Sequence, residues 1–151
     1  MKIIFILFIF IFSNVVNAEN LNFKKLVDLN DPWGSTFTDE NNLLITEKSG
    51  AIKLININTK NINLINHNLN FLEHGQGGLL DILFDSNYVY ISYSENRGNW
   101  KTSTSIARAK FNNKKLIFKN IFQANPPIDS GYHFGSRLVI KGEYLYASAG
   151  E

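Results

Sequence analysis

The chain has 151 residues, a formal net charge of +2 and no cysteine. Its lysines are scattered and form no basic stripe that could follow a phosphate backbone, so the composition argues against nucleic-acid binding. The fold cannot depend on disulfide bonds, and the length suits one small domain.

The first eighteen residues have the composition of a secretory signal peptide. A positive residue is followed by the apolar run Ile3–Phe12 and by compact residues at Val16 and Ala18, which is the order of an n-region, an h-region and a cleavage site. The run is too short for a membrane-spanning helix, which takes about 20 residues. We predict a signal peptide at 1–18, cleaved before Glu19, and an exported, periplasmic protein with no membrane span. An uncleaved N-terminal anchor is the alternative.

After the leader, the sequence alternates with the period of two that is typical of β-strands, and helical periodicity is hard to find. Short polar turns separate the apolar segments, as in a series of hairpins. Strands are predicted in chain order at Gly34–Phe37, Leu43–Thr46, Ala51–Ile57, Asn61–Ile65, Leu79–Phe84, Tyr88–Tyr93, Thr104–Phe111, Leu116–Phe122 and Phe134–Ile140.

One pattern recurs along the chain: a polar turn, then an apolar strand that ends in small or hydroxyl residues. The copies are Asn41–Glu47, Ser86–Ser92 and Gly142–Ser148, spaced roughly 45 and then about 55 residues apart, in the range of propeller blades. An apolar strand precedes each copy, so each unit begins with an inner strand and steps outwards. We predict an all-β fold, a partial β-propeller of about two and a half blades. A small self-contained β-sandwich is the alternative.

Trp33, Gln76 and His133 lie just before, or at the start of, the predicted inner strands. Loops that lead into inner strands converge at one mouth of a propeller, so we expect these three residues to share a pocket. Gln76 stands among three glycines, which let a ligand approach the backbone closely, and its amide can donate and accept hydrogen bonds. The alternative is an ordinary tight turn with a solvated glutamine.

His133 is the candidate general base, because a neutral imidazole, with an ordinary pKa of about 6.5, can take a proton from an alcohol at neutral pH. A structural histidine, or one metal ligand, is the alternative. No second histidine stands at ligand spacing, which argues against a zinc site. His67 and His74 are expected to be surface residues, with His74 close enough to Gln76 to reach the rim of the pocket.

Arg137 lies four residues after His133 in a predicted strand, so the two side chains should face the same side. Its guanidinium could bind an anionic cofactor or a carboxylate within the channel. The alternative is a buried ion pair with an acid such as Asp81. Asp81 interrupts the apolar strand Leu79–Phe84 and is expected to be a hydrogen-bonded structural acid.

Several segments resemble, in the right order, the soluble quinoprotein sugar dehydrogenases, the aldose, glucose and sorbosone dehydrogenase family that uses pyrroloquinoline quinone (PQQ). The resemblance spans nearly all of the chain after the leader, and it implies a six-bladed propeller with PQQ across the channel mouth, usually with Ca²⁺ beside it. The segments are Asp31–Ile55, Gly75–Phe84, Val89–Ser94 with Ser105–Phe111, and His133–Ile140 with Tyr144–Glu151.

By this resemblance His133 matches the base that takes the proton of the sugar's anomeric hydroxyl, while hydride passes from the sugar C1 to the quinone. Gln76 matches the residue that hydrogen-bonds the quinone carbonyl, and Arg137 is our candidate for an anionic group of the cofactor. The implied reaction is oxidation of an aldose at C1 to the lactone, with an electron acceptor that the sequence does not identify. A non-catalytic periplasmic propeller that binds a ligand or a protein is the alternative, and a propeller hydrolase lacks the carboxylate cluster it would need.

The resemblance also leads us to interpret residues 19–151 as the N-terminal part of such a propeller. The family commonly reads Gly-Asp-Arg where this chain has Gly150 and Glu151, and its Ca²⁺ ligands and PQQ-binding cations come mostly from later blades. We therefore predict that the 151-residue chain alone binds PQQ weakly or not at all. The measurement is a PQQ titration followed by dye reduction on adding an aldose. Saturable, stoichiometric binding with turnover would contradict the prediction.

Overall fold

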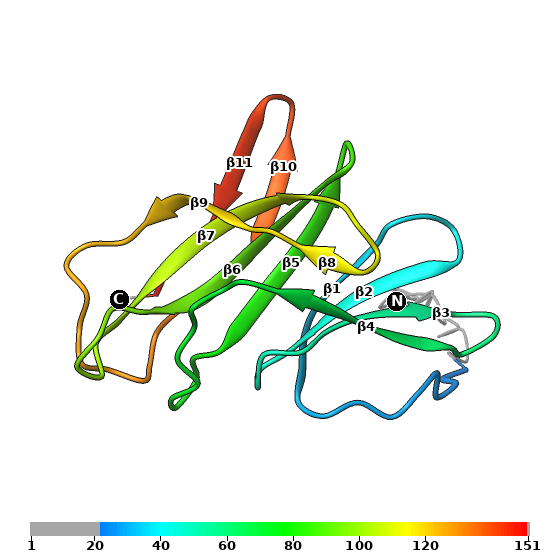
Figure 1. The fold of residues 1–151 in the computed structure, drawn as a ribbon, viewed down its shortest axis with the longest axis horizontal. Helices are drawn as coiled ribbons and strands as arrows, with labels where there is room; N and C mark the ends of the chain where they lie inside the picture. Colours follow the sequence, from blue (N-terminus) through cyan, green and yellow to red (C-terminus); the bar gives the residue numbers. More distant parts are fainter. Residues whose placement is uncertain (1–21, 151) are drawn as a thin grey trace, which may run out of the picture.

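The computed structural model describes residues 22–150, so the predicted signal peptide at 1–18 lies outside the described part of the chain. These residues form eleven β-strands and no helix (Figure 1). No helix long and apolar enough to cross a membrane occurs among them. The predicted all-β class is confirmed.

The first four strands form an antiparallel meander, with each strand paired to the next. The β1–β2 turn is fixed by Asp39, whose Oδ1 accepts the backbone N–H groups of Asn41 and Asn42 at 2.9 and 3.0 Å. Hydrogen bonding from the Asn42 side chain, with these backbone bonds, lowers the pKa of Asp39. The strands are β1 (Pro32–Phe37), β2 (Asn42–Glu47), β3 (Ile52–Asn56) and β4 (Ile62–His67).

A second sheet repeats this meander, and a hairpin follows it. The two inner strands β1 and β10 both pack against the inner strand β5, so successive sheets are arranged like neighbouring blades of a propeller (Figure 1). The second sheet contains β5 (Leu79–Asp85), β6 (Tyr88–Asn96), β7 (Thr102–Lys110) and β9 (Lys119–Gln123), and the hairpin contains β10 (Leu138–Lys141) and β11 (Tyr144–Ala147).

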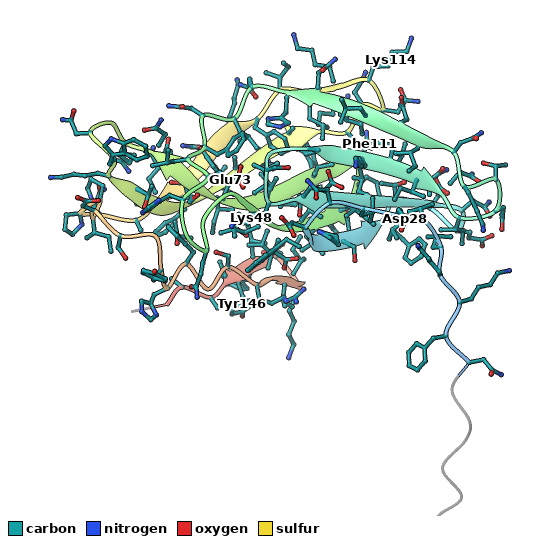
Figure 2. The ribbon with its side chains drawn as sticks, turned by 90° about the horizontal axis from the view of Figure 1, so that it is seen from below. Asp28, Lys48, Glu73, Phe111, Lys114 and Tyr146 are labelled. Carbon is teal, nitrogen blue, oxygen red and sulfur yellow. The ribbon has the colours of Figure 1, made fainter. Side chains whose placement is uncertain are left out.

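Figure 2 shows the molecule turned by 90°, with Tyr146 of the hairpin and Lys114, which follows β7, on opposite faces. Between the sheets lies one cluster of buried apolar side chains, contributed by alternate positions of the strands, as expected for sheets that pack face to face. Its fully or almost fully buried members are Leu44, Ile52, Ile65, Leu79, Ile82, Val89, Ile91, Ala107 and Leu116.

The predicted strand Leu116–Phe122 is wrong as a single strand. It is divided into β8 (Lys115–Leu116), which pairs in parallel with β4 of the first sheet, and β9, which pairs with β7. The division falls at Phe118, whose backbone N–H donates to Asn68 Oδ1 at 2.8 Å and whose carbonyl accepts Asn68 Nδ2 at 3.1 Å. A side chain from the segment after β4 thus replaces the ladder partner, and the two sheets are joined at their outer edges.

The predicted strand Phe134–Ile140 is also wrong in its first half, because β10 begins only at Leu138. The preceding backbone has positive φ at Gly135 (62°) and Ser136 (90°), which no strand accommodates. His133 and Arg137 therefore do not share a strand, and the alternation rule that placed them on one side does not apply.

The outer strand β9 is held to β6 by a polar network that crosses β7. Tyr93, which is 2% exposed, donates its hydroxyl to Asn120 Oδ1 at 2.7 Å. Glu95 accepts Asn120 Nδ2 at 2.9 Å and Gln123 Nε2 at 2.6 Å. Burial raises the pKa of Tyr93 to about 12.

This shift predicts an alkaline loss of stability. The pKa of Tyr93 rises from 10.0 to about 12 on folding. The stabilisation of the folded state that comes with this shift is therefore fully present below pH 10 and is lost as the pH rises through about 12. In Tyr93→Phe the free energy of unfolding should fall less over this range than in the wild type. Urea unfolding followed by circular dichroism at several pH values measures this, with Tyr144→Phe, an exposed tyrosine, as control. Equal pH dependence in the wild type and Tyr93→Phe would refute it.

Candidate functional site

Gln76 and His133, 57 residues apart in the sequence, are in direct contact. The backbone N–H of His133 donates to Gln76 Oε1 at 3.1 Å, and the backbone N–H of Gln76 donates to the carbonyl of Gly131 at 2.6 Å. The loop that leads into β5 is thus tied to the loop before β10. The structure brings these two residues together as the repeat register predicted, while their chemical roles stay predictions.

Two glycines allow this close contact between the loops. Gly75 has a φ of 57°, and a Cβ atom there would lie 2.4 Å from the carbonyl oxygen of Gly131. A Cβ atom on Gly131 would lie 2.7 Å from His74 Cδ2. Any larger residue at either position would separate the loops. The glycine-rich sequence around Gln76 pointed to the first of these positions, but nothing in the sequence singled out Gly131.

The backbone of His133 has a left-handed conformation, with a φ of 66°. Such a conformation is uncommon for a residue with a bulky side chain and costs of order 1–3 kcal/mol, so it persists only where the surroundings impose it. The imidazole is exposed and lies against the ring of Tyr132 with 6.2 Å between centroids. Within residues 22–150 neither of its ring nitrogens has a hydrogen-bond partner, which leaves them free for a ligand.

Buried hydroxyl groups hold the strained loop in place. Ser92 Oγ donates to the carbonyl of Ser136 at 2.7 Å and accepts the backbone N–H of Asp81 at 3.0 Å. Thr104 Oγ1 and Ser136 Oγ both donate to the carbonyl of Phe134, at 3.1 and 2.7 Å. Sequence reasoning missed these positioning residues, although hydroxyl residues within the apolar segments of β6 and β7 were a signal that could have found them.

Asp81 forms the ion pair with Arg137 that the sequence left open as an alternative. Its Oδ1 lies 3.3 Å from Arg137 Nη1, and its Oδ2 accepts the backbone N–H of Leu138 at 2.8 Å. The Asp81 side chain is 7% exposed and that of Arg137 is 72% exposed. Asp81 is thus a structural acid, as expected, whereas the Arg137 guanidinium is mostly open to solvent.

Trp33 does not lie in one pocket with Gln76 and His133, which corrects the expectation that all three share one. It lines a neighbouring recess of about 390 Å³ together with Asp81, Arg137 and Ser148. Gly135 and Ser136 line this same recess. An irregular segment, and not a regular inner strand, therefore lies beside Trp33.

The other two histidines differ from each other. His67 is half-buried, so the expectation of a surface residue is wrong. Its Nδ1 accepts the backbone N–H of Leu69 at 3.2 Å, so Nε2 carries the proton and donates to the carbonyl of Gly50 at 2.7 Å. His74 is exposed at the rim, as expected, and its ring meets that of Trp100 edge-on. Residues 22–150 contain no group of three or more His, Cys, Asp or Glu side chains that could hold a metal ion.

The blades, with the Gln76 amide bonded to the His133 backbone in the loops before two inner strands, define the class: part of a β-propeller. The family model described as glucose / sorbosone dehydrogenase matches residues 29–151. The chain therefore belongs to the glucose/sorbosone dehydrogenase family.

Its relatives support the same assignment. The aldose sugar dehydrogenase YliI of Escherichia coli (strain K12) is 31% identical over 146 residues, which cover 90% of this chain and 38% of the relative. A crystal structure of a glucose dehydrogenase matches with a TM-score of 0.78 at 32% identity, covering 85% of this chain and 40% of that one. The PQQ-bound aldose sugar dehydrogenase of Streptomyces coelicolor matches in fold, with a TM-score of 0.71 at 22% identity, covering 82% of this chain and 39% of that one. The chain thus spans well under half of the length of these proteins.

The contact between the two loops can be tested at Gly75. Gly75→Ala should destabilise the protein more than Gly142→Ala, because both residues have a left-handed φ but only Gly75 is crowded by another loop. The backbone cost of about 1–2 kcal/mol is common to both variants. Urea unfolding measures the difference, and amide hydrogen exchange at His133 should accelerate only in Gly75→Ala. Equal losses of stability would contradict the proposed role of close approach.

Proposed function

We propose that this chain is part of a PQQ-dependent sugar dehydrogenase that oxidises an aldose at C1 to the lactone. The observation that carries the proposal is the contact between the His133 backbone and the Gln76 side chain, which supports a base and a hydrogen-bond donor at one mouth. Because the chain covers 38–41% of the matched dehydrogenases, the activity is proposed for the whole propeller.

The residues at the mouth fit a planar, anionic quinone. Gln76 Oε1 is occupied by the N–H of His133, so its Nε2 group is directed elsewhere and is free to donate to a carbonyl oxygen. Negative charge develops on such an oxygen during reduction, and a fixed donor stabilises it. Arg137, with its exposed guanidinium, would bind a carboxylate of the cofactor. When bound, PQQ supplies the two-electron acceptor that the oxidation requires.

His133 is assigned to the proton. A neutral ring nitrogen would accept the proton of the anomeric hydroxyl while C1 gives up a hydride. The product is the lactone. The held backbone of His133 would fix the direction of the imidazole without using either ring nitrogen, and both therefore stay free for the substrate. No residue of this chain is assigned to Ca²⁺, because the described residues offer no cluster of ligands.

The location and domain limits are part of the same proposal. We infer an exported, periplasmic protein, with a signal peptide at 1–18 and the propeller from 19 onwards. The support is the apolar run with its flanking residues in the sequence.

The base assignment predicts the behaviour of His133→Asn in a complete propeller, for example one in which residues 29–150 replace the matching part of the Escherichia coli aldose sugar dehydrogenase. Aldose-dependent dye reduction should fall by about 10²–10⁴-fold, since general-base catalysis contributes that much. PQQ binding, followed by absorbance, should be kept.

Lys141→Gln, at the exposed last residue of β10, is the control and should leave both properties unchanged. Full turnover in His133→Asn would overturn the base assignment. Absence of PQQ binding in every version would instead favour a non-catalytic ligand-binding propeller.

A further inference from the structure

A hydroxyl group on the second strand of a sheet makes the same two hydrogen bonds twice along the chain. Thr46 Oγ1 accepts the backbone N–H of Gly34 at 3.0 Å and donates to the carbonyl of Leu80, in the next inner strand, at 2.5 Å. Ser92 Oγ repeats both bonds one sheet later, at 3.0 and 2.7 Å. Each hydroxyl therefore links its own inner strand to the one that follows.

Ser148, directly after the second strand of the hairpin, is the third copy of this hydroxyl, and it makes only the first of the two bonds. Its Oγ accepts the backbone N–H of Arg137 at 3.0 Å. Within residues 22–150 the hydrogen of this hydroxyl has no acceptor. The third sheet therefore has a donor left over at the position where the first two sheets bind their neighbour.

The first sheet has the matching acceptor. The carbonyl groups that accept from the first two hydroxyls belong to Leu80 and Ser136, each one residue before the N–H group that the next hydroxyl binds. In the first sheet that position is Trp33, which precedes Gly34. No side chain in the described part of the chain donates to the Trp33 carbonyl. A carbonyl oxygen can accept two hydrogen bonds, so this oxygen can take the donor that Ser148 leaves over.

The first sheet also has apolar side chains on the face that points away from β5. Thr36 points towards β5, because its Oγ1 accepts the backbone N–H of Phe84 at 3.2 Å, so its neighbour Phe37 points away. Through the ladder pairs of β2 and β3, Phe37 shares this face with Ile62 and Leu64. These three apolar side chains are between 45% and 58% exposed.

The hairpin presents a second apolar face. Leu138 is buried where β10 packs against β5, so the next residue, Val139, points away from β5. Val139 pairs with Tyr146 across the hairpin, and the two are 51% and 55% exposed. Exposed apolar side chains that gather on one face mark an interaction surface, and here both ends of the row of blades have one.

The inner strands already show how two such ends fit together. β5 packs against β1 on one side and against β10 on the other. The chain supplies three inner strands, β1, β5 and β10, so two copies supply six, and closed propellers have four to eight blades. A two-fold axis along the channel sets the first sheet of each copy against the hairpin of the other.

We propose that a second copy of this chain closes the ring of blades. In this dimer the Ser148 hydroxyl donates to the carbonyl of Trp33 in the other copy, and the bond occurs twice because of the two-fold symmetry. Val139 and Tyr146 of the hairpin cover the apolar face around Phe37 of the other copy. Neither contact involves PQQ, so the association goes beyond the proposed function and does not depend on it.

The mass of the purified 151-residue chain, measured by sedimentation velocity over a concentration series, tests the dimer. The wild type should sediment at twice the monomer mass of 17.2 kDa. Val139→Glu should raise the Kd of the dimer about tenfold or more, because it buries a carboxylate that has no partner. Ile117→Glu is the matched control. Ile117 lies between β8 and β9 and is 50% exposed, so this variant should associate as the wild type does.

The hydroxyl of Ser148 is tested separately. Ser148→Ala should raise the Kd about fivefold or more, because each dimer loses two hydrogen bonds. Ser148→Thr should restore association, since the first sheet has a threonine, Thr46, at the equivalent position. Circular dichroism checks that both variants keep the fold of the wild type.

A mixture of variants distinguishes this ring from other kinds of dimer. Phe37→Glu disrupts the face of the first sheet, and Val139→Glu disrupts the face of the hairpin. Each variant alone should be mostly monomeric where the wild type is a dimer. An equal mixture should recover part of the association, because one of the two contacts in a mixed dimer is intact.

Three results would overturn the inference. A wild-type chain that stays monomeric would show that a second copy does not cover these faces, and would leave them to a further segment of polypeptide. Polymers of increasing mass would contradict the closed ring. A dimer that survives both Val139→Glu and Ser148→Ala, or a mixture that associates no better than either variant, would assign the association to another surface.

Discussion

A hydroxyl on the second strand of each of the first two sheets is the interaction on which the arrangement of the blades depends. The inner strands β1 and β5 both have an irregular register near their starts, which removes a backbone N–H from the ladder. In the first sheet Thr46 Oγ1 accepts that N–H from Gly34 at 3.0 Å and donates to the carbonyl of Leu80, in the next inner strand, at 2.5 Å. Ser92 makes the equivalent two bonds one sheet later. Neighbouring blades share no ladder at these inner strands, so their buried backbone groups need side-chain partners, and one hydroxyl serves both blades.

The same interaction accounts for the candidate site. Ser92 and Thr104 fix the carbonyl groups of the segment before β10, and the left-handed residues of that segment are the result. Each such hydrogen bond contributes about 1 kcal/mol net, so several are needed to offset backbone strain of about 1–3 kcal/mol per residue. The backbone of His133 is therefore held in place, while its ring nitrogens have no hydrogen-bond partner within residues 22–150.

The sequence predicts most of the fold because alternation and repeat spacing are local or periodic signals. They located the strands of the first sheet and the first two inner strands, and the repeat register predicted that Gln76 and His133 lie close together, as they do. They failed where a distant side chain replaces the ladder, as Asn68 does at Phe118. The sequence repeat also aligned Glu47 with Ser92, whereas the strand pairing in the structure makes Thr46 the equivalent of Ser92. That slip of one residue hid the repeated hydroxyl, since no local signal fixes the register between blades.

The two partners of the Asp81–Arg137 ion pair have different surroundings. Both carboxylate oxygens of Asp81 are engaged, one by the backbone of Leu138 and one by Arg137, and the side chain is buried. Removing either partner would leave a buried carboxylate partly unpaired, so Asp81 serves as a structural acid. Arg137 is at the other extreme. Its guanidinium is mostly exposed, and its contact with Asp81 is 3.3 Å long. The same ion pair therefore ties the start of β10 to β5 and leaves the Arg137 guanidinium largely open to solvent.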